Sequence, residues 1–351
     1  MIRRIEIRQQ FNILVLFMIV QFGGILLASL VFSTTTLTSI TSASQSGQIN
    51  TPEQALWFFV YFVIATLIIL LAFKIYHGDV LFRLFEGFVI IVSSLFVFIV
   101  LLGYFFPSEP YLVSIIALIL AVLLIVLKNK QPKLRNTVAI IASMGVGLVL
   151  GLDFGFLVAY LLVAVIAAYD YIAVFVTKHM LTLANAVSSR GLAFLIGSTD
   201  IEVIPKGFFN KKEAEEYAKY KKELQKIKNP IIKGLIRKGK LPLISQVQLG
   251  AGDLGIPLML AISSYKLAAS YFLPIAIAIG AVFGMVYTMY IQKKYLIPLP
   301  AIPPLFSFMS MALGLALLPL GLEYFSFFFI SGILVLLIFT LQARRSAQKK
   351  V

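Results

Sequence analysis

Long uninterrupted apolar runs are the feature that most restricts the fold of this chain. Residues 11–32 and residues 110–127, for example, contain no charged side chain. An α-helix needs about twenty apolar residues to cross the ~30 Å hydrocarbon core of a bilayer. A membrane-spanning β-strand instead alternates apolar and polar residues over about ten positions. The runs therefore predict an all-α polytopic membrane protein in a lipid bilayer and argue against a β-barrel.

The overall composition excludes several other classes of protein. Of the 351 residues, 60% are hydrophobic and 13% are charged, against roughly 25% charged in soluble domains. The net charge of +15 would suggest nucleic acid as a partner of a soluble protein, but in a membrane protein it first indicates cytoplasmic loops. We therefore expect no nucleic-acid partner.

Cysteine and histidine usage limits the chemistry available to the chain. It has no cysteine, and its only histidines are His77 and His179. Disulfides, thiolate metal sites and cysteine nucleophiles are thus excluded, and a site built from several histidines is too. The HExxH and GxSxG signatures of zinc proteases and serine hydrolases are also missing. We expect no cofactor and no metal.

Ten segments have a length and composition suited to crossing a membrane. They are residues 11–32, 56–73, 88–106, 110–127, 137–152, 154–176, 242–263, 267–290, 301–319 and 323–341. Connections on one side of this arrangement carry every one of the 30 lysines and arginines except Lys266. The positive-inside rule assigns that side to the cytoplasm. We expect a multi-pass protein of the cell membrane with cytoplasmic N- and C-termini.

The spans and their connections divide the chain into five segments. They are residues 1–153 (spans one to five), 154–177 (span six), 178–240 (a cytoplasmic loop), 241–320 (spans seven to nine) and 321–351 (an additional span and a basic tail). Within the loop, residues 210–228 predict an exposed helix with opposite charges four positions apart. Residues 192–196 and 201–204 predict short extended pieces.

Two acidic residues, Asp170 and Asp253, fall inside predicted spans. A carboxylate at membrane depth costs about 2.5–3.5 kcal/mol on insertion scales, so such residues are candidates for function. Spans six and seven are antiparallel, and the helical rise places both acids in the cytoplasmic half. Gly250 and Gly252 would let another backbone approach Asp253, and the hydroxyl of Tyr169 could orient a carboxylate or a substrate.

A close pair of carboxyl groups supports two interpretations. Because two neighbouring acids cannot both ionise, they share one proton. One can then accept a proton from a water that attacks a peptide carbonyl, while the other polarises the carbonyl oxygen. A proton or cation relay in a transporter uses intramembrane acids as well, and the two acids by themselves favour transport.

A proline-rich run precedes the predicted ninth span. Residues 298–304 contain four prolines, which donate no backbone hydrogen bond, so we expect the run to stay extended. Extended backbone at membrane depth survives only beside protein or a water-filled cavity. By itself the run indicates no more than a stiff entry to the ninth span.

Taken together, three motifs resemble the YD, GxGD and PALP signatures of the presenilin and signal peptide peptidase family. They are Tyr169-Asp170, Gly250-Ala251-Gly252-Asp253 and Pro300-Ala301-Ile302-Pro303. The resemblance, closest to archaeal presenilin homologues around residues 169–180, implies an intramembrane aspartyl protease with Asp170 and Asp253 as the catalytic pair. It implies active-site support or substrate binding by Tyr169, Gly250, Gly252, Leu254, Pro300, Ala301, Ile302 and Pro303. Transmembrane peptides or signal peptides would be the substrates.

The resemblance also implies a fold and a branch of the family. The fold is a presenilin-like nine-helix bundle, to which this chain would add a tenth C-terminal helix. An N-terminus inside the cell favours the presenilin-like branch. Ile302 replaces the usual leucine of the proline motif, which is a volume-conserving change. Residues 241–247 and 300–303 are candidates to pair with an unwound substrate as a strand.

Two alternatives stay open at this point. A prepilin-type GxGD peptidase would not account for the proline motif or for Asp170 in the sixth span. A transporter or ion leak should have inverted repeats or broken helices in both halves. Gly145, Gly147 and Gly151 keep that alternative open for the N-terminal half. The sequence does not predict an oligomeric state.

Overall fold

The computed structural model describes the greater part of the chain. The described residues are 2–33, 79–131, 134–177, 195–204, 241–268, 270–295 and 299–348, with isolated positions between 53 and 68. They form two compact units. Met1–Ile13 and Gly197–Gln248 belong to the smaller one, and Leu14–Ile196 and Leu249–Val351 to the larger one.

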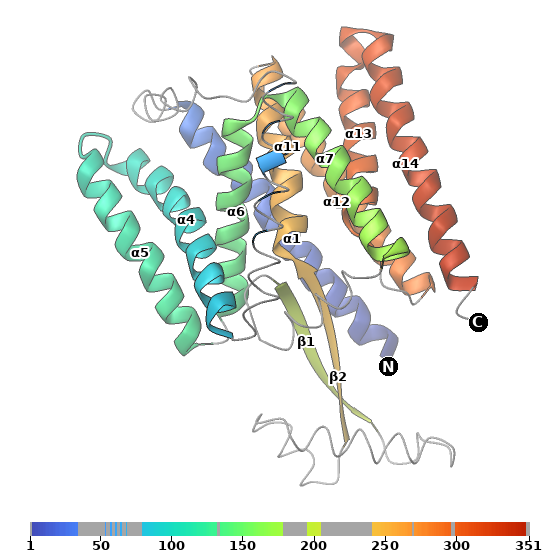
Figure 1. Cartoon of the computed structure of the whole chain (residues 1–351), viewed down its shortest axis with the longest axis horizontal. Helices are drawn as coiled ribbons and strands as arrows, with labels where there is room; N and C mark the ends of the chain where they lie inside the picture. Colours follow the sequence, from blue (N-terminus) through green and yellow to red (C-terminus); the bar gives the residue numbers. More distant parts are fainter. Residues whose placement is uncertain are drawn as a thin grey trace. The chain divides into compact units, whose positions relative to one another are not determined.

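Helices dominate the described chain (Figure 1). In chain order they are α1 (Ile2–Ser33), α4 (Asp79–Phe105), α5 (Pro110–Lys130), α6 (Arg135–Asp153), α7 (Phe156–Tyr171), the π-helix η2 (Ile172–Val176), α11 (Ala251–Ala268), α12 (Phe272–Tyr295), α13 (Ile302–Leu317), the 3-10 helix η4 (Leu318–Leu320) and α14 (Leu322–Gln348). Two strands, β1 (Leu195–Ile204) and β2 (Leu241–Gly250), pair in a two-stranded sheet.

Eight helical segments among the described residues are long and apolar enough to cross a membrane. They correspond to eight of the ten predicted spans, and α14 occupies the place of the last one. The predicted span at 56–73 lies largely outside the described residues. The multi-pass membrane architecture is therefore confirmed, while the total of ten spans stays a prediction.

The seventh predicted span differs from the structure at its start. Residues 242–250 belong to β2, and the helix α11 begins only at Ala251. The prediction of a helix from residue 242 is wrong because Ser245, Gln246 and Gln248 interrupt the apolar residues of this stretch. Such interruption suits a strand better than a spanning helix.

The predictions for the long loop have mixed outcomes. The extended piece at 201–204 is confirmed as part of the longer strand β1, which also includes Leu195 and Ile196. Residues 192–194 and the helix predicted at 210–228 lie outside the described residues.

Glycines of α6 allow close packing against its neighbours. A Cβ atom at Gly147 would lie 2.8 Å from Leu258 of α11, and one at Gly151 would lie 2.7 Å from Ile262 of the same helix. Gly145 faces the backbone of Ser93 in α4 in the same way. Such contacts are typical of small residues between membrane helices. α6 is continuous, so these glycines mark packing surfaces and not a broken helix.

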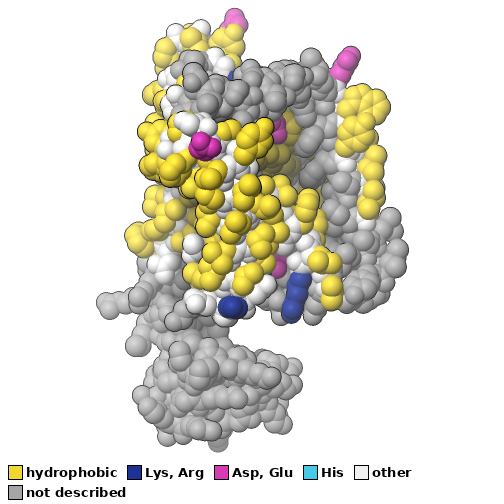
Figure 2. All heavy atoms as spheres, turned by 90° about the vertical axis from the view of Figure 1, so that its left-hand side faces the viewer, with side chains coloured by type: hydrophobic (Ala, Val, Ile, Leu, Met, Phe, Trp, Pro, Cys, Tyr) yellow, Lys and Arg dark blue, Asp and Glu magenta, His cyan; other side chains and the backbone are white. Residues whose placement is uncertain are grey.

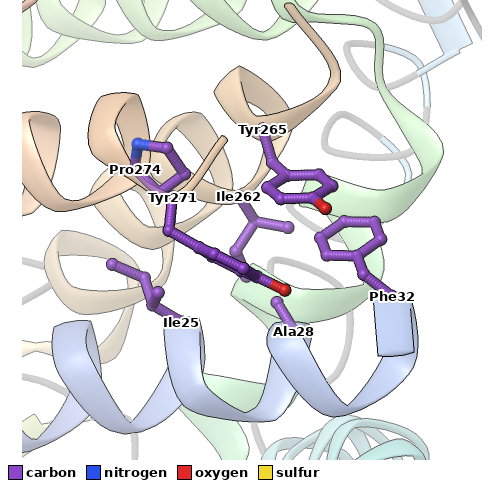
Figure 3. A pocket seen from close by; sticks show the side chains of 7 residues that line it. All are labelled: Ile25, Ala28, Phe32, Ile262, Tyr265, Tyr271 and Pro274. Atoms are coloured by element: carbon purple, nitrogen blue, oxygen red, sulfur yellow. The ribbon is translucent and has the colours of Figure 1, made fainter. Parts of the chain in front are cut away.

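Helix α1 packs along α11 on another side. The ring of Phe32 stacks on that of Tyr265 with 4.1 Å between centroids, and a Cβ atom at Gly24 would collide with Leu258. Tyr271, which precedes α12, lies beside a shallow apolar crevice at this end of the two helices (Figure 3). Its lining contains no charged side chain.

Lys266, the exception to the charge rule, has a structural explanation. Its ammonium group donates to the carbonyl oxygens of Leu152 and, at 3.0 Å, of Phe154, and it interacts with the charge of Asp153. These groups lie at the C-terminal end of α6, where carbonyls lack helical partners and the helix dipole favours a cation. Lys266 therefore caps α6 from the last turn of α11.

The surface of the described helices suits lipid. On the face in Figure 2, hydrophobic side chains cover most of the described surface, and the clearly visible Lys and Arg side chains lie near its lower edge. Large apolar side chains are exposed along whole helices, as in α5, where Ile115 and Ile119 are about 60% exposed. In water such a surface would associate, whereas in a bilayer it is solvated.

Candidate functional site

Asp170 and Asp253 lie on neighbouring helices at the same end of the bundle. Asp170 is in the last turn of α7, directly before the π-helix η2, and Asp253 is in the first turn of α11. Both side chains are half-buried, and the charge of Asp170 acts on Asp253. The structure therefore brings together the two acids that the sequence singles out.

Asp170 holds the N-terminus of a third helix, α13. The Ile302 N–H donates to Oδ2 of Asp170 over 3.2 Å, and the Ala301 N–H lies close enough to stabilise the same carboxylate. A helix leaves its first four N–H groups without helical partners. Here the other two positions are Pro303 and Pro304, which have no N–H. Asp170 thus lies beside both backbone donors that the first turn of α13 possesses, and it accepts a hydrogen bond from Ile302.

The proline run is more helical than expected. Ala301 already has helical backbone angles, and α13 begins at Ile302, so the prediction of extended chain through residue 304 is wrong beyond Pro300. The physical reason is that proline is well tolerated in the first turn of a helix, where its missing N–H costs no hydrogen bond. Pro300, Ile302 and Pro303 are buried.

Asp253 is held by the end of β2 and the start of α11. The backbone N–H of Gly250 donates to its carboxylate, and a Cβ atom at Gly250 would lie 3.1 Å from Oδ2. At Gly252 the nearest neighbour of a Cβ atom would be Ile256, at 4.0 Å. The first glycine of the motif is therefore the one that the carboxylate needs, while the second is open enough for a methyl group.

Leu254 and Tyr169 have different surroundings. Leu254 is fully buried, and its carbonyl oxygen accepts a 2.9 Å hydrogen bond from the amide of Gln21 in α1. Tyr169 is 53% exposed on the outer side of α7. Of these two predicted site residues, only Leu254 belongs to the packed interior beside the acids.

Sequence reasoning missed Gln21 as well as a cluster of three hydroxyls at Tyr160, Ser310 and Ser331. Gln21 is fully buried, and its Oε1 has no hydrogen-bond partner. The hydroxyls of the three other residues lie within 2.7–3.1 Å of one another. A signal was present in the sequence, since polar residues inside apolar spans are costly unless they find partners.

The site offers carboxyl groups and backbone dipoles for chemistry. Among the described residues, no group of three or more His, Asp and Glu side chains is arranged to hold a metal ion. Two interacting carboxyl groups can together donate and accept a proton, which is the requirement for general acid–base catalysis. The N-terminus of α13 adds fixed N–H donors beside them.

Comparisons with known proteins identify the family and the fold. The family model for signal-peptide peptidase and presenilin aspartyl protease matches residues 14–305. Two solved structures of a presenilin family intramembrane aspartate protease, in different crystal forms, resemble the chain with TM-scores of 0.53 and 0.54 at 18% and 19% identity. These alignments cover 87% and 88% of this chain and 97% of the other. No curated protein matches it.

Proposed function

Because the chain belongs to the signal-peptide peptidase and presenilin aspartyl protease family, we propose that it hydrolyses peptide bonds in or near transmembrane segments of other membrane proteins. The observation that carries this proposal is that Asp170 and Asp253 lie at the same end of the packed helices α7 and α11, close enough for the charge of one to act on the other. We assign the catalytic roles to these two residues.

The proposed reaction uses the two acids as a unit that holds one proton. The ionised carboxyl accepts a proton from a water molecule while the water oxygen bonds to the scissile carbonyl carbon. The protonated carboxyl gives its proton to the carbonyl oxygen, which forms a gem-diol. The gem-diol then collapses: one of its hydroxyl groups returns a proton to the ionised carboxyl as the C=O bond re-forms, the C–N bond breaks, and the leaving nitrogen takes up a proton from the other carboxyl. The pair ends the cycle with one proton again.

The Ala301 and Ile302 N–H groups would fix Asp170 during this cycle. A carboxylate that accepts an N–H bond from a helix terminus and lies beside a second N–H group has little freedom to rotate. Gly250, at the end of β2, would restrain Asp253. Restraint of both carboxyl groups matters because misplacement of catalytic groups by 1 Å can lower a rate about a hundredfold.

Substrate binding must also make the scissile carbonyl of a transmembrane helix accessible. A transmembrane substrate helix shields its own scissile carbonyl, since all its backbone groups are bonded internally. Local unwinding would free these groups, and we propose that they pair with extended enzyme backbone. Residues 241–247, within β2, are the better candidate, because β2 is already a strand. Pro300 offers only a carbonyl, and the N–H groups of the next two residues are engaged by Asp170.

A cleavage assay tests the proposed function. The full chain in liposomes should cleave a tagged single-span substrate, and Asp170→Asn and Asp253→Asn should each abolish cleavage. Asp153→Asn is the matched control, since Asp153 ends α6 beside Lys266, and this variant should keep activity. Cleavage that survives either of the first two substitutions would exclude the two-aspartate mechanism.

The alternative functions are not favoured. The continuous course of α6 removes the feature that had kept a transporter open for the N-terminal half. A prepilin-type peptidase leaves the contact between Asp170 and α13 without a role.

A further inference from the structure

Helix α14 lies beyond the part of the chain that the family model matches, which ends at residue 305. It nevertheless packs tightly against α13, its neighbour in Figure 1. A Cβ atom at Gly332 of α14 would lie 2.6 Å from the Ser307 carbonyl oxygen, and one at Gly314 of α13 would lie 3.0 Å from the Phe329 nitrogen. Each helix therefore contributes a glycine at which the backbones of α13 and α14 lie close together.

A buried hydroxyl cluster joins three helices at this interface. It consists of Tyr160 in α7, Ser310 in α13 and Ser331 in α14. The Tyr160 oxygen lies 2.7 Å from that of Ser310 and 3.1 Å from that of Ser331. Both serines donate over 2.9 Å to the carbonyl oxygen of Phe328. The tyrosine proton can then go to Ser310, so each hydroxyl hydrogen has an acceptor.

The tyrosine ring strengthens the same junction. Tyr160 is 5% exposed and packs against Phe306 of α13 and Phe328 of α14, with 5.2 and 5.0 Å between ring centroids. Buried aromatic pairs of this kind favour one defined arrangement. The hydroxyl cluster and the ring contacts thus fix α7 against both other helices at one level.

A second contact of α14 lies near the other end of the segment that carries Asp170. Phe339 of α14 is fully buried and contacts the ring of Phe175 in η2, with 6.2 Å between centroids. Tyr160 precedes Asp170 by ten residues and Phe175 follows it by five. The helical rise separates these two contacts by roughly 20 Å, and Asp170 lies between them.

The opposite side of α13 is held by α12. A Cβ atom at Gly284 would lie 2.7 Å from the Cα atom of Leu305, in the first turn of α13. α13 is therefore held between α12 and α14, while its first N–H groups hold Asp170. A shift of α14 would leave α13 without one of the surfaces that set its position.

We infer that α14 positions the active site: through the hydroxyl cluster and the contact at Gly332, it sets the position of α13 relative to α7, and so the bond between Ile302 and Asp170. This inference rests on the proposed protease function for its kinetic consequence. Tyr160, Ser310 and Ser331 are positioning residues and do not contact the substrate.

Kinetics test the role of the cluster. Ser331→Ala and Tyr160→Phe should each lower kcat about tenfold with little change in KM, because displaced catalytic groups lose rate steeply. The cleavage position should also become less uniform in the product masses. Ser326→Ala is the matched control in the same helix, since Ser326 donates to Leu322 within α14, and it should behave like the unaltered protein. Ser331→Thr keeps a hydroxyl and should recover activity relative to Ser331→Ala.

A distance measurement tests the geometry without any need for activity. The chain has no cysteine, so Leu161→Cys and Leu315→Cys place two spin labels uniquely, on exposed positions of α7 and α13. Ser331→Ala should broaden the distance distribution between the labels, and Ser326→Ala should not.

The outcomes separate the inference from the proposed function. If kcat or the distance distribution is the same in Ser331→Ala and Ser326→Ala, the positioning role of α14 is wrong. If the unaltered protein cleaves no substrate, the proposed function fails, while the distance measurement still decides whether α14 fixes α13 against α7. A lower melting temperature with unchanged distances would likewise overturn the inference.

Discussion

Hydrogen bonds of single residues explain why the proline motif belongs to the site. The first turn of α13 has only two N–H donors, because Pro303 and Pro304 lack them, and both donors are directed at Asp170. Each buried backbone donor needs a partner. The motif therefore makes a helix start whose two N–H groups both lie beside a single carboxylate.

The two glycines of the GxGD motif should differ in importance at the residue scale. A methyl group at Gly250 would displace the Asp253 carboxylate by a few tenths of an ångström, since its Cβ would lie 3.1 Å from Oδ2. We expect Gly250→Ala to lower kcat about tenfold, and Gly252→Ala to lower it less. Steady-state cleavage of one substrate by both variants measures this difference. An equal loss would show that contact with Asp253 does not explain the first glycine.

Buried charged residues of one helix interact with groups of a neighbouring helix. Lys128 of α5 pairs with Glu86 of α4, and both side chains are less than 10% exposed. Lys266 of α11 caps the end of α6. Because burial of an unpaired charge is costly, such pairs specify which helices become neighbours. The contact of Lys266 also fixes α11, whose first turn carries Asp253.

Removal of the Lys266 charge should destabilise the junction between α6 and α11. Lys266→Met keeps most of the side-chain length but leaves the carbonyl oxygens of Leu152 and Phe154 without their donor. We expect a loss of about 1 kcal/mol of stability, the usual scale for a cation at a helix C-terminus. Thermal unfolding in detergent measures this loss. Lys130→Met, at the exposed end of α5, is the control, and an equal effect of both would contradict the capping role.

The uneven distribution of basic residues predicts how the whole molecule is oriented in the membrane. All the basic residues except Lys266 fall on one side of the predicted spans, and the structure accounts for that exception inside the bundle. The predicted orientation follows from the rule that cytoplasmic connections carry the excess of lysine and arginine. It would place the aspartate pair toward the cytoplasm, where water has the shorter path to it.

Labelling of whole cells tests this orientation. In the cysteine-free chain, Ser108→Cys marks the connection between α4 and α5, and Gln348→Cys marks the end of α14. Both positions are exposed. A membrane-impermeant maleimide should label residue 108 in intact cells and residue 348 only after the membrane is opened. The reverse pattern would invert the predicted topology.

The sequence alone indicated that this protein lies in a lipid bilayer, located most of its helices and singled out Asp170 and Asp253. Apolar runs of spanning length need no tertiary information, because each helix satisfies its own backbone in lipid. An acidic residue inside such an apolar run can likewise be recognised without tertiary information. The GxGD and proline motifs could therefore be located and assigned to a family before their contacts were known.

Only the tertiary structure decided how these parts meet. It made residues 241–250 a strand, started α13 at Ile302, and directed two N–H groups at Asp170. It also gave Lys266, Gln21 and the hydroxyl cluster their partners. The contacts of Asp170, Lys266, Gln21 and Tyr160 join residues more than a hundred positions apart, whereas Ser310 and Ser331 are 21 positions apart. Local periodicity carries no information about such pairs, because it reports which face of a helix is apolar and not which helix that face will meet.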